Sequence, residues 1–293
     1  MELINTKKKN PKKLSFISIY FLGINGVIGS GAFLLPQVIY KDMNLASVLV
    51  LLCAAITVSM VALCYADLSS RFTGSGAAWL YSYNAFGRFT GYELGIFTWF
   101  LGCCTLSAEV VALLTTLRSF LPIFNTHWVY YVSVFGLILL FSIINFFGRT
   151  LVKLVDNLSS AAKMITILAF IVIGVFCIHF ANFSPVIPHA ATTGAMPLAK
   201  HFGAAFSVAF YMFTGFSFIP IAAKQMTDPE KNIPRVLIAV MVSVTIMYSL
   251  MMLVAIGILG TRMSKYSTPI ANAFGTGVGK WGYILVIVGM LIS

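Results

Sequence analysis

Apolar residues in this chain are gathered into long runs that charged residues scarcely interrupt. A helix needs about 20 mostly apolar residues to cross a bilayer. The pattern predicts seven membrane-spanning helices, at about residues 15–38, 44–66, 92–117, 128–147, 159–181, 203–224 and 235–259. An eighth apolar run begins near Trp281 and reaches Ser293 without the length of a full span.

Two of the predicted spans are interrupted by glycine and proline. The first carries Gly31 and Pro36, the sixth carries Gly215 and Pro220, and four residues separate glycine from proline in each. Both residue types weaken a helix, so we expect these spans to unwind near mid-membrane and to free backbone groups that lipid cannot satisfy. A pair of interrupted helices indicates the substrate site of a transporter. Close helix packing at glycine is the alternative explanation.

The segments between the spans carry signals of their own. Residues 71–83, after the second span, mix glycine with aromatic side chains. They are too polar to span the bilayer and too apolar for a free loop, so we expect a short interfacial or re-entrant helix there. In the stretch 226–235, Pro229 and Pro234 are expected to end one helix and start the next.

The composition excludes a soluble globular protein. Hydrophobic residues make up 59% of the chain and charged residues only 9%, whereas soluble domains carry about 25% charged residues. The fold class expected from composition and pattern together is therefore an all-α integral membrane protein, with the lipid bilayer as its surroundings.

Basic residues predict the orientation of the chain. With a cytoplasmic N-terminus, twelve Lys and Arg residues fall inside and six outside, while Lys163 lies within a span. This bias follows the positive-inside rule, so we predict a multi-pass protein of the cell membrane whose N-terminus is cytoplasmic. The net charge of +11 is then explained by topology, without a nucleic-acid partner.

The sequence holds no motif of an enzyme or a metal site. Its five cysteines lie in or near apolar spans without metal-ligand spacing. Paired aspartates, His-Glu-x-x-His and Ser/Lys or Ser/His nucleophile arrangements are not found either. We therefore expect no enzymatic activity, no metal and no organic cofactor.

Three stretches carry a likeness to a known family: the glycine-rich break at residues 26–33, the loop after the second span at 65–87, and the loop after the sixth span at 228–235. Together they resemble the corresponding motifs of the amino acid–polyamine–organocation superfamily of amino acid permeases. The resemblance extends from about Leu14 to the end of the chain. It departs from the family at Ser217, where many relatives carry an acidic residue, so a role of that carboxylate does not transfer.

The resemblance implies a fold of two inverted repeats of five helices. It would place a basic cytoplasmic tail at residues 1–13, the first repeat at 14–181 and an incomplete second repeat at 203–293. Because the run 281–293 is too short to span, we expect the chain to stop within the eighth helix. On this expectation it is the N-terminal fragment of a longer transporter.

An amino acid substrate brings a carboxylate and an ammonium group, which need donors and acceptors respectively. Donors at the start of a half-helix suit a carboxylate, so we predict that Ser30 and Gly31 bind it. Carbonyls freed at the two breaks would accept from the ammonium, and the predicted positions are Val27, Ile28, Phe210, Tyr211 and Thr214, beside Gly215. The resemblance places binding on the same segments and implies that the aromatic ring of Tyr211 covers the substrate. Helix packing is the alternative role for Ser30 and for Tyr211.

Two ionisable residues within the predicted spans are functional candidates. A lysine within a span costs roughly 3 kcal/mol to insert, which makes Lys163 a functional candidate. Burial disfavours the charged form of its amine, and the resemblance implies that a lysine at this place replaces a sodium ion in proton-coupled relatives. We predict that Lys163 carries the coupling proton; the alternative is that it snorkels to the interface. Glu109 should face the bundle, either in a structural hydrogen bond or in proton movement.

The function hypothesis is secondary transport of an amino acid across the cytoplasmic membrane by proton symport, with the substrate at the two broken helices. Amino acid exchange, which needs no proton carrier, is one alternative. A sensor that binds a ligand without moving it is another. The sequence contains no repeated polar filter, so a channel is not expected. Ser217 and the apolar surroundings of both breaks favour a substrate with a neutral side chain.

Overall fold

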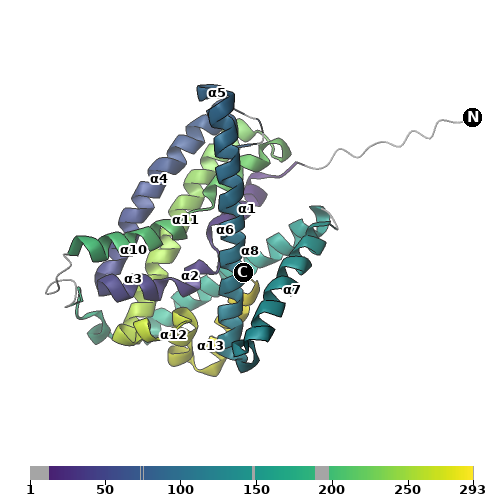
Figure 1. The fold of residues 1–293 in the computed structure, drawn as a ribbon. Coiled ribbons are helices and arrows are strands. Elements are labelled where there is room, and N and C mark those ends of the chain that lie inside the picture. Colours follow the sequence, from purple (N-terminus) through teal and green to yellow (C-terminus); the bar gives the residue numbers. More distant parts are fainter. Residues whose placement is uncertain (1–12, 73, 75, 147–148, 189–197, 293) are drawn as a thin grey trace, which may run out of the picture.

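The computed structural model describes residues 13–72, 74, 76–146, 149–188 and 198–292, and Figure 1 shows the arrangement of their elements. Within these residues the elements are α-helices and short 3₁₀ helices, with an isolated β-bridge between Leu14 and Met226. Six helical stretches are long and apolar enough to cross a membrane by length and composition. The fold is therefore all-α and multi-pass, as predicted.

The first predicted span is interrupted. Helix α1 (Phe16–Val27) ends before the backbone leaves the helix at residues 28–30. Helices α2 (Gly31–Leu34) and α3 (Pro36–Met43) then resume it, and the span continues beyond the predicted end at 38. Pro36 takes the first position of α3, where its missing N–H costs no helical hydrogen bond. The predicted break is confirmed, and α1 alone is too short to count among the six spans.

The sixth predicted span is interrupted as well. Helix α10 (Leu198–Met212) ends in a turn at residues 213–215, and the 3₁₀ helix η5 (Phe216–Gln225) follows. Pro220 lies inside η5. Runs of 3₁₀ helix beyond about four residues are uncommon and often mark a hinge. The second half of this span is therefore a weaker helix than its first half.

The remaining predicted spans are single helices: α4 (Ser47–Arg71), α6 (Arg88–Phe120), α7 (His127–Phe146), α8 (Arg149–Gly174) and α11 (Pro229–Leu259). The prediction that Pro234 starts the seventh span is wrong, because α11 begins at Pro229 and runs through Pro234. A long helix tolerates one lost hydrogen bond near its start when the rest of it packs against its neighbours.

Short elements complete the chain. Helix α5 (Ala78–Phe86) confirms the short helix expected within 71–83, although it extends three residues further. Helix α12 (Pro269–Val278) was not predicted, and α13 (Lys280–Ile292) contains the eighth apolar run. The other 3₁₀ helices are η1 (Asn44–Ala46), η2 (Pro122–Asn125), η3 (Val175–Cys177), η4 (Phe180–Phe183) and η6 (Gly260–Lys265).

Helices α4 and α11 form the centre of the packing, and α1 and α10 lie against them. Side chains such as Ala54 on α4 and Val244 on α11 are fully buried. Figure 1 shows α4, α10 and α11 gathered on one side of the view and α7 on the other. Helix α7 has no buried residue, and α6 has few. The α4–α11 pair therefore holds the broken helices, whereas α6 and α7 present apolar surface.

The two broken helices touch backbone to backbone at their breaks. A methyl group added at Gly215 would overlap the carbonyl oxygen of Gly26, and one added at Gly26 would lie 3.3 Å from the carbonyl oxygen of Gly215. Gly215 also has a φ of +105°, which residues with a side chain rarely adopt. Glycine at position 215 is therefore required both by conformation and by space.

The outer ends of the broken helices are tied together too. The Leu14 N–H, just before α1, donates to the carbonyl of Gln225 at the end of η5 (2.8 Å), and the Thr227 N–H donates to the carbonyl of Leu14 (3.1 Å). At the opposite ends, the His201 imidazole of α10 lies 3.1 Å from the Asp42 carboxylate of α3. The two broken helices thus contact each other at both ends and in the middle.

Replacing Gly215 with alanine is expected to lower the free energy of unfolding by at least about 2 kcal/mol, because the left-handed conformation and the overlap with Gly26 both oppose a side chain. Gly203→Ala is the matched control, since nothing lies within 4 Å of its added methyl group in α10. Thermal unfolding of both variants in detergent measures the difference. Equal unfolding temperatures for the two would contradict a required contact between the breaks.

Candidate functional site

The first break exposes the carbonyl groups at the end of α1. The Tyr248 hydroxyl of α11 donates to the carbonyl of Val27 (3.2 Å), and the Lys163 ammonium of α8 donates to the carbonyl of Ile28 (2.8 Å). Both carbonyls were predicted to accept from a substrate ammonium. In the structure, side chains from two distant helices contact them.

Lys163 is almost completely buried, with 2% of its surface exposed. Its ammonium also donates to the side-chain oxygen of Asn25 in α1, at 2.6 Å. The negative end of a helix dipole lies at the C-terminus of α1, so a cation is favourable there. The Lys163 side chain therefore reaches the break. It does not extend toward the membrane interface, as the alternative interpretation of the sequence would require.

Glu109 of α6 contacts the other side of the same break. Its carboxylate accepts from the Ser30 hydroxyl at 2.5 Å and from the Ser30 N–H at 3.4 Å. A methyl group added at Gly29 would overlap the second carboxylate oxygen. The donors predicted for a substrate carboxylate at Ser30 thus hold a carboxylate of the protein itself. Hydrogen bonds of this kind, between a donor and a charged acceptor, are stronger than neutral ones.

At the second break the freed carbonyls are engaged locally. The Phe210 carbonyl accepts from the Phe213 N–H (3.2 Å), and the Tyr211 carbonyl accepts from the Thr214 N–H (3.0 Å) and the Thr214 hydroxyl (2.7 Å). These bonds close a tight turn before Gly215. A carbonyl oxygen has two lone pairs, so such carbonyls keep some capacity to accept from a ligand.

Tyr211 extends from the second break toward the first broken helix. Its ring edge lies 4.0 Å from the position that a methyl group on Gly31 would take, and 40% of the side chain is exposed. The ring therefore stands beside Gly31 without being enclosed by protein. It is placed where a ligand between the two helices would touch it.

The structure thus brings the ten predicted site residues into one region. The first break carries Val27, Ile28, Ser30 and Gly31; the second contributes Phe210, Tyr211, Thr214 and Gly215; Lys163 and Glu109 approach from α8 and α6. Sequence reasoning missed Tyr248 and Asn25. A fully buried tyrosine hydroxyl requires a hydrogen-bond partner, so a tyrosine in the apolar run of α11 was a usable signal.

Aromatic residues pack around the start of η5. The Tyr65 ring of α4 makes edge contacts with Phe216 (ring centroids 5.5 Å apart) and with Tyr81 of α5 (6.0 Å). Burial, together with the neighbouring Tyr65, raises the pKa of Tyr81 to about 12, so its phenol is neutral at physiological pH. This neutral cluster links α5 to the second half of the sixth span, next to the break.

Within the described residues, no three His, Cys, Asp or Glu side chains gather as potential metal ligands. The polar groups at the breaks are instead backbone carbonyls, a serine hydroxyl, a carboxylate and an ammonium. Such groups can recognise a small zwitterion or hold a proton.

Comparison with known proteins gives a consistent result. The family model described as amino acid permease matches residues 14–293. The chain is 29% identical to an uncharacterized transporter of Mycobacterium tuberculosis, over 96% of this chain and 62% of that protein. It is 25% identical to the chloroplastic cationic amino acid transporter 9 of Arabidopsis thaliana, over 95% of this chain and 51% of that protein. It is likewise 25% identical to the methylthioribose transporter of Bacillus subtilis, over 93% of this chain and 61% of that protein. The chain therefore spans between half and two thirds of the length of these relatives.

The contact between Ser30 and Glu109 generates a stability prediction. Ser30→Ala is expected to lower the free energy of unfolding by about 1–2 kcal/mol, because the partly buried carboxylate of Glu109 loses its hydroxyl donor. In a Glu109→Gln background, Ser30→Ala should lower the free energy of unfolding by clearly less. A double-mutant cycle measured by unfolding in detergent isolates the interaction energy between Ser30 and Glu109.

Ser107→Ala is the matched control for that cycle. Among the described residues, the Ser107 hydroxyl bonds the Cys103 carbonyl of its own helix and faces outward, so its loss should change stability little and show no coupling to Glu109. Zero coupling between positions 30 and 109 would contradict the contact.

Proposed function

Because this chain belongs to the amino acid permease family, we propose that it binds an amino acid where its two broken helices meet and carries it across the membrane with a proton. One observation carries the proposal. The breaks of α1–α2 and α10–η5 touch at Gly26 and Gly215, and a buried lysine and a carboxylate bond to the backbone there. Irregular backbone at membrane depth is tolerated where it lines a cavity or is buried in protein.

The substrate carboxylate is proposed to bind at Ser30 and Gly31. The Ser30 hydroxyl and N–H already donate hydrogen bonds to the carboxylate of Glu109. This supports the assignment, because the same donors can bind the carboxylate of a substrate. A substrate would have to share or take over these donors. Protonation of Glu109 would weaken its hold on Ser30, since a neutral carboxyl is a poorer acceptor than a carboxylate.

The substrate ammonium is proposed to bind between the carbonyls of Val27 and Ile28 and those of Phe210, Tyr211 and Thr214. The ring of Tyr211, half exposed beside Gly31, would cover the substrate from the second break. A neutral side chain suits this site, because Ser217 adds no charge in η5. The relative from Arabidopsis is named for cationic amino acids and the one from Bacillus for methylthioribose, so both belong in the substrate panel.

Lys163 is proposed to carry the coupling proton. When protonated, its ammonium bonds both Asn25 and the Ile28 carbonyl and thereby fixes the end of α1. A neutral amine has one hydrogen fewer to donate and no charge to place at the helix end, so deprotonation would loosen this end of the break. The protonation state of Lys163 would then be linked to the shape of the substrate site.

The orientation follows from charge. We propose that the N-terminus is cytoplasmic, because twelve Lys and Arg residues would then lie inside and six outside. Leu14 and the end of η5 would accordingly face the cytoplasm, while Asp42 and His201 would face outward. The protein would reside in the cell membrane.

Lys163→Ala is expected to reduce proton-driven uptake to background, because the proposed proton carrier is lost. Purified protein in liposomes would be given labelled neutral amino acids, cationic amino acids and methylthioribose, with an inward proton gradient and then with the gradient collapsed by an ionophore. Lys200→Ala, an exposed lysine of α10, is the control and should keep uptake.

The outcomes separate the candidate functions. Undiminished gradient-driven uptake in Lys163→Ala would contradict the proton role. Uptake that ignores the gradient but requires amino acid inside the vesicle would indicate exchange. Substrate binding in a thermal-shift assay without any uptake would indicate a sensor, and methylthioribose as the preferred ligand would overturn the amino acid assignment.

A further inference from the structure

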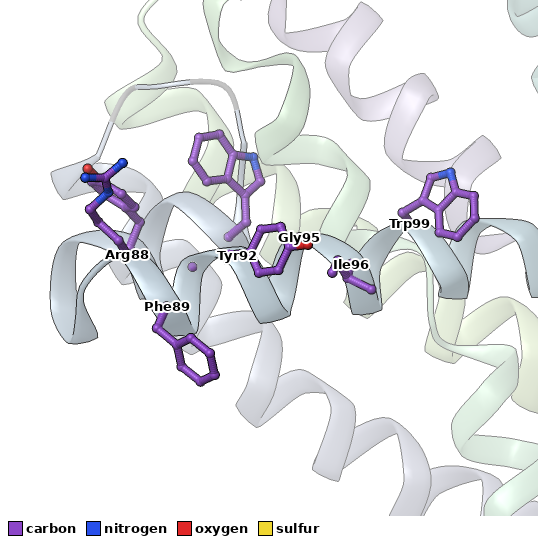
Figure 2. A pocket seen from close by; sticks show the side chains of 9 residues that line it. Arg88, Phe89, Tyr92, Gly95, Ile96 and Trp99 are labelled. Carbon is purple, nitrogen blue, oxygen red and sulfur yellow. The ribbon is translucent and has the colours of Figure 1, made fainter.

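An aromatic groove lies on the outer face of α5 and α6, apart from the breaks. Its volume is about 950 Å³, and its lining includes Trp79, Tyr83, Arg88, Tyr92, Gly95 and Trp99. Figure 2 shows Arg88 at one end of the row along α6 and Trp99 at the other. The groove is open, and most of its side chains are exposed. The exposed fraction is 68% for Tyr92 and 70% for Trp99.

The length of the groove fits one leaflet of a bilayer. Arg88 and Trp99 are eleven positions apart on a continuous helix, which corresponds to about 16 Å along its axis. Half of the hydrocarbon core of a bilayer is about 15 Å thick. Helix α6 extends from Arg88 to Phe120, long enough to cross the core and reach the headgroup region at both ends. With Arg88 at headgroup level, Trp99 would lie about 16 Å deeper, within the hydrocarbon core.

The charge at the headgroup end is positive. Arg88 is exposed and is the one ionisable cation of the lining, and among the described residues no carboxylate pairs with it. The first turn of α6 holds no acidic residue. Glu93, the next acidic residue along α6, is exposed but does not line the groove. At the other end of α6, Arg118 is already engaged, since it stacks over the ring of Tyr130 at 4.1 Å.

The floor of the groove is free of side chains where an acyl chain would lie. Nothing lies within 4 Å of a methyl group added at Gly95, while Gly91 packs closely against Tyr83 of α5. Trp79 and Tyr83 form one wall from α5, and Tyr92 and Trp99 stand along α6. Tryptophan and tyrosine favour the interface between lipid headgroups and hydrocarbon.

We propose that this groove binds one anionic phospholipid, with its phosphate at Arg88 and one acyl chain along Gly95 toward Trp99. Basic pockets beside membrane helices recognise anionic headgroups, and one arginine near an anionic surface favours them by about fivefold over neutral ones. A second copy of the chain or another membrane helix on the glycine floor is the competing occupant. The site is distinct from the breaks and does not depend on the proposed transport.

Tryptophan quenching tests the proposal directly. Of the four tryptophans, Trp79 and Trp99 line the groove, and Trp128 and Trp281 would be changed to phenylalanine. The protein is reconstituted in phosphatidylcholine vesicles that contain a fixed small fraction of brominated phosphatidylglycerol or brominated phosphatidylcholine. The expected result is stronger quenching by phosphatidylglycerol, equivalent to about a fivefold preference.

Three variants decide the origin of that preference. Arg88→Gln should abolish it, Arg88→Lys should retain it, and Gly95→Leu should weaken quenching by both lipids because the floor is filled. Arg71→Gln is the control, since Arg71 is exposed and pairs with Asp67 on α4, outside the groove.

Two results would overturn the proposal. Equal quenching by the two brominated lipids, unchanged in Arg88→Gln, would mean that the groove meets only bulk lipid. Quenching by neither lipid in the parent protein would mean that protein covers the groove.

Discussion

The contact between Gly26 and Gly215 is the constraint on which the rest of the site depends. Two interrupted helices can meet backbone to backbone only where neither carries a side chain, and both positions here are glycine. The contact brings the uncapped ends of two helices into one region of the bundle. The second break engages its carbonyls in a local turn, whereas the first exposes polar backbone groups that hydrocarbon cannot satisfy. The surrounding helices must therefore provide polar partners, and these partners are the candidate functional residues.

The partners form a pattern that resembles the ligand expected at the site. An ammonium group, from Lys163, bonds the carbonyl on one side of the first break, and a carboxylate, from Glu109, bonds Ser30 on the other side. An amino acid zwitterion offers the same two groups. The site thus already holds, from its own helices, the two charges that the proposed substrate would bring. Under the proposed function, competition between these internal charges and those of the substrate would link ligand binding to movement of the broken helices.

The periphery of the molecule is organised by a different requirement. Helix α4 buries one face and α11 is buried along much of its length, whereas α6 carries Glu109 on its inner face and exposed aromatic residues elsewhere. In water such a surface would promote aggregation, but in a bilayer it is an ordinary lipid contact. Arg88, about two helical turns from the open Gly95 in the same groove, would give this surface a preference for anionic lipid. One helix thereby serves the proposed substrate site with one face and the membrane with the other.

The sequence by itself determined the features that depend on local chemistry. The apolar runs predicted the helices, and the glycine and proline residues predicted both breaks, because these residues weaken a helix wherever they occur. Lys163 and Glu109 were identifiable because an ionisable residue in a span is costly. Local prediction failed in detail at Pro234, which lies inside α11. It also did not indicate the turn in which the carbonyls of Phe210 and Tyr211 accept hydrogen bonds from Phe213 and Thr214.

Only the tertiary structure decided which groups satisfy the broken backbone. Lys163 is 135 positions from Ile28, Glu109 is 79 from Ser30, and Tyr248 is 221 from Val27. A sequence shows which carbonyls and N–H groups lose their helical partners, because those partners lie within four residues. It does not show which distant side chain replaces them, since that follows from how α6, α8 and α11 pack around the break.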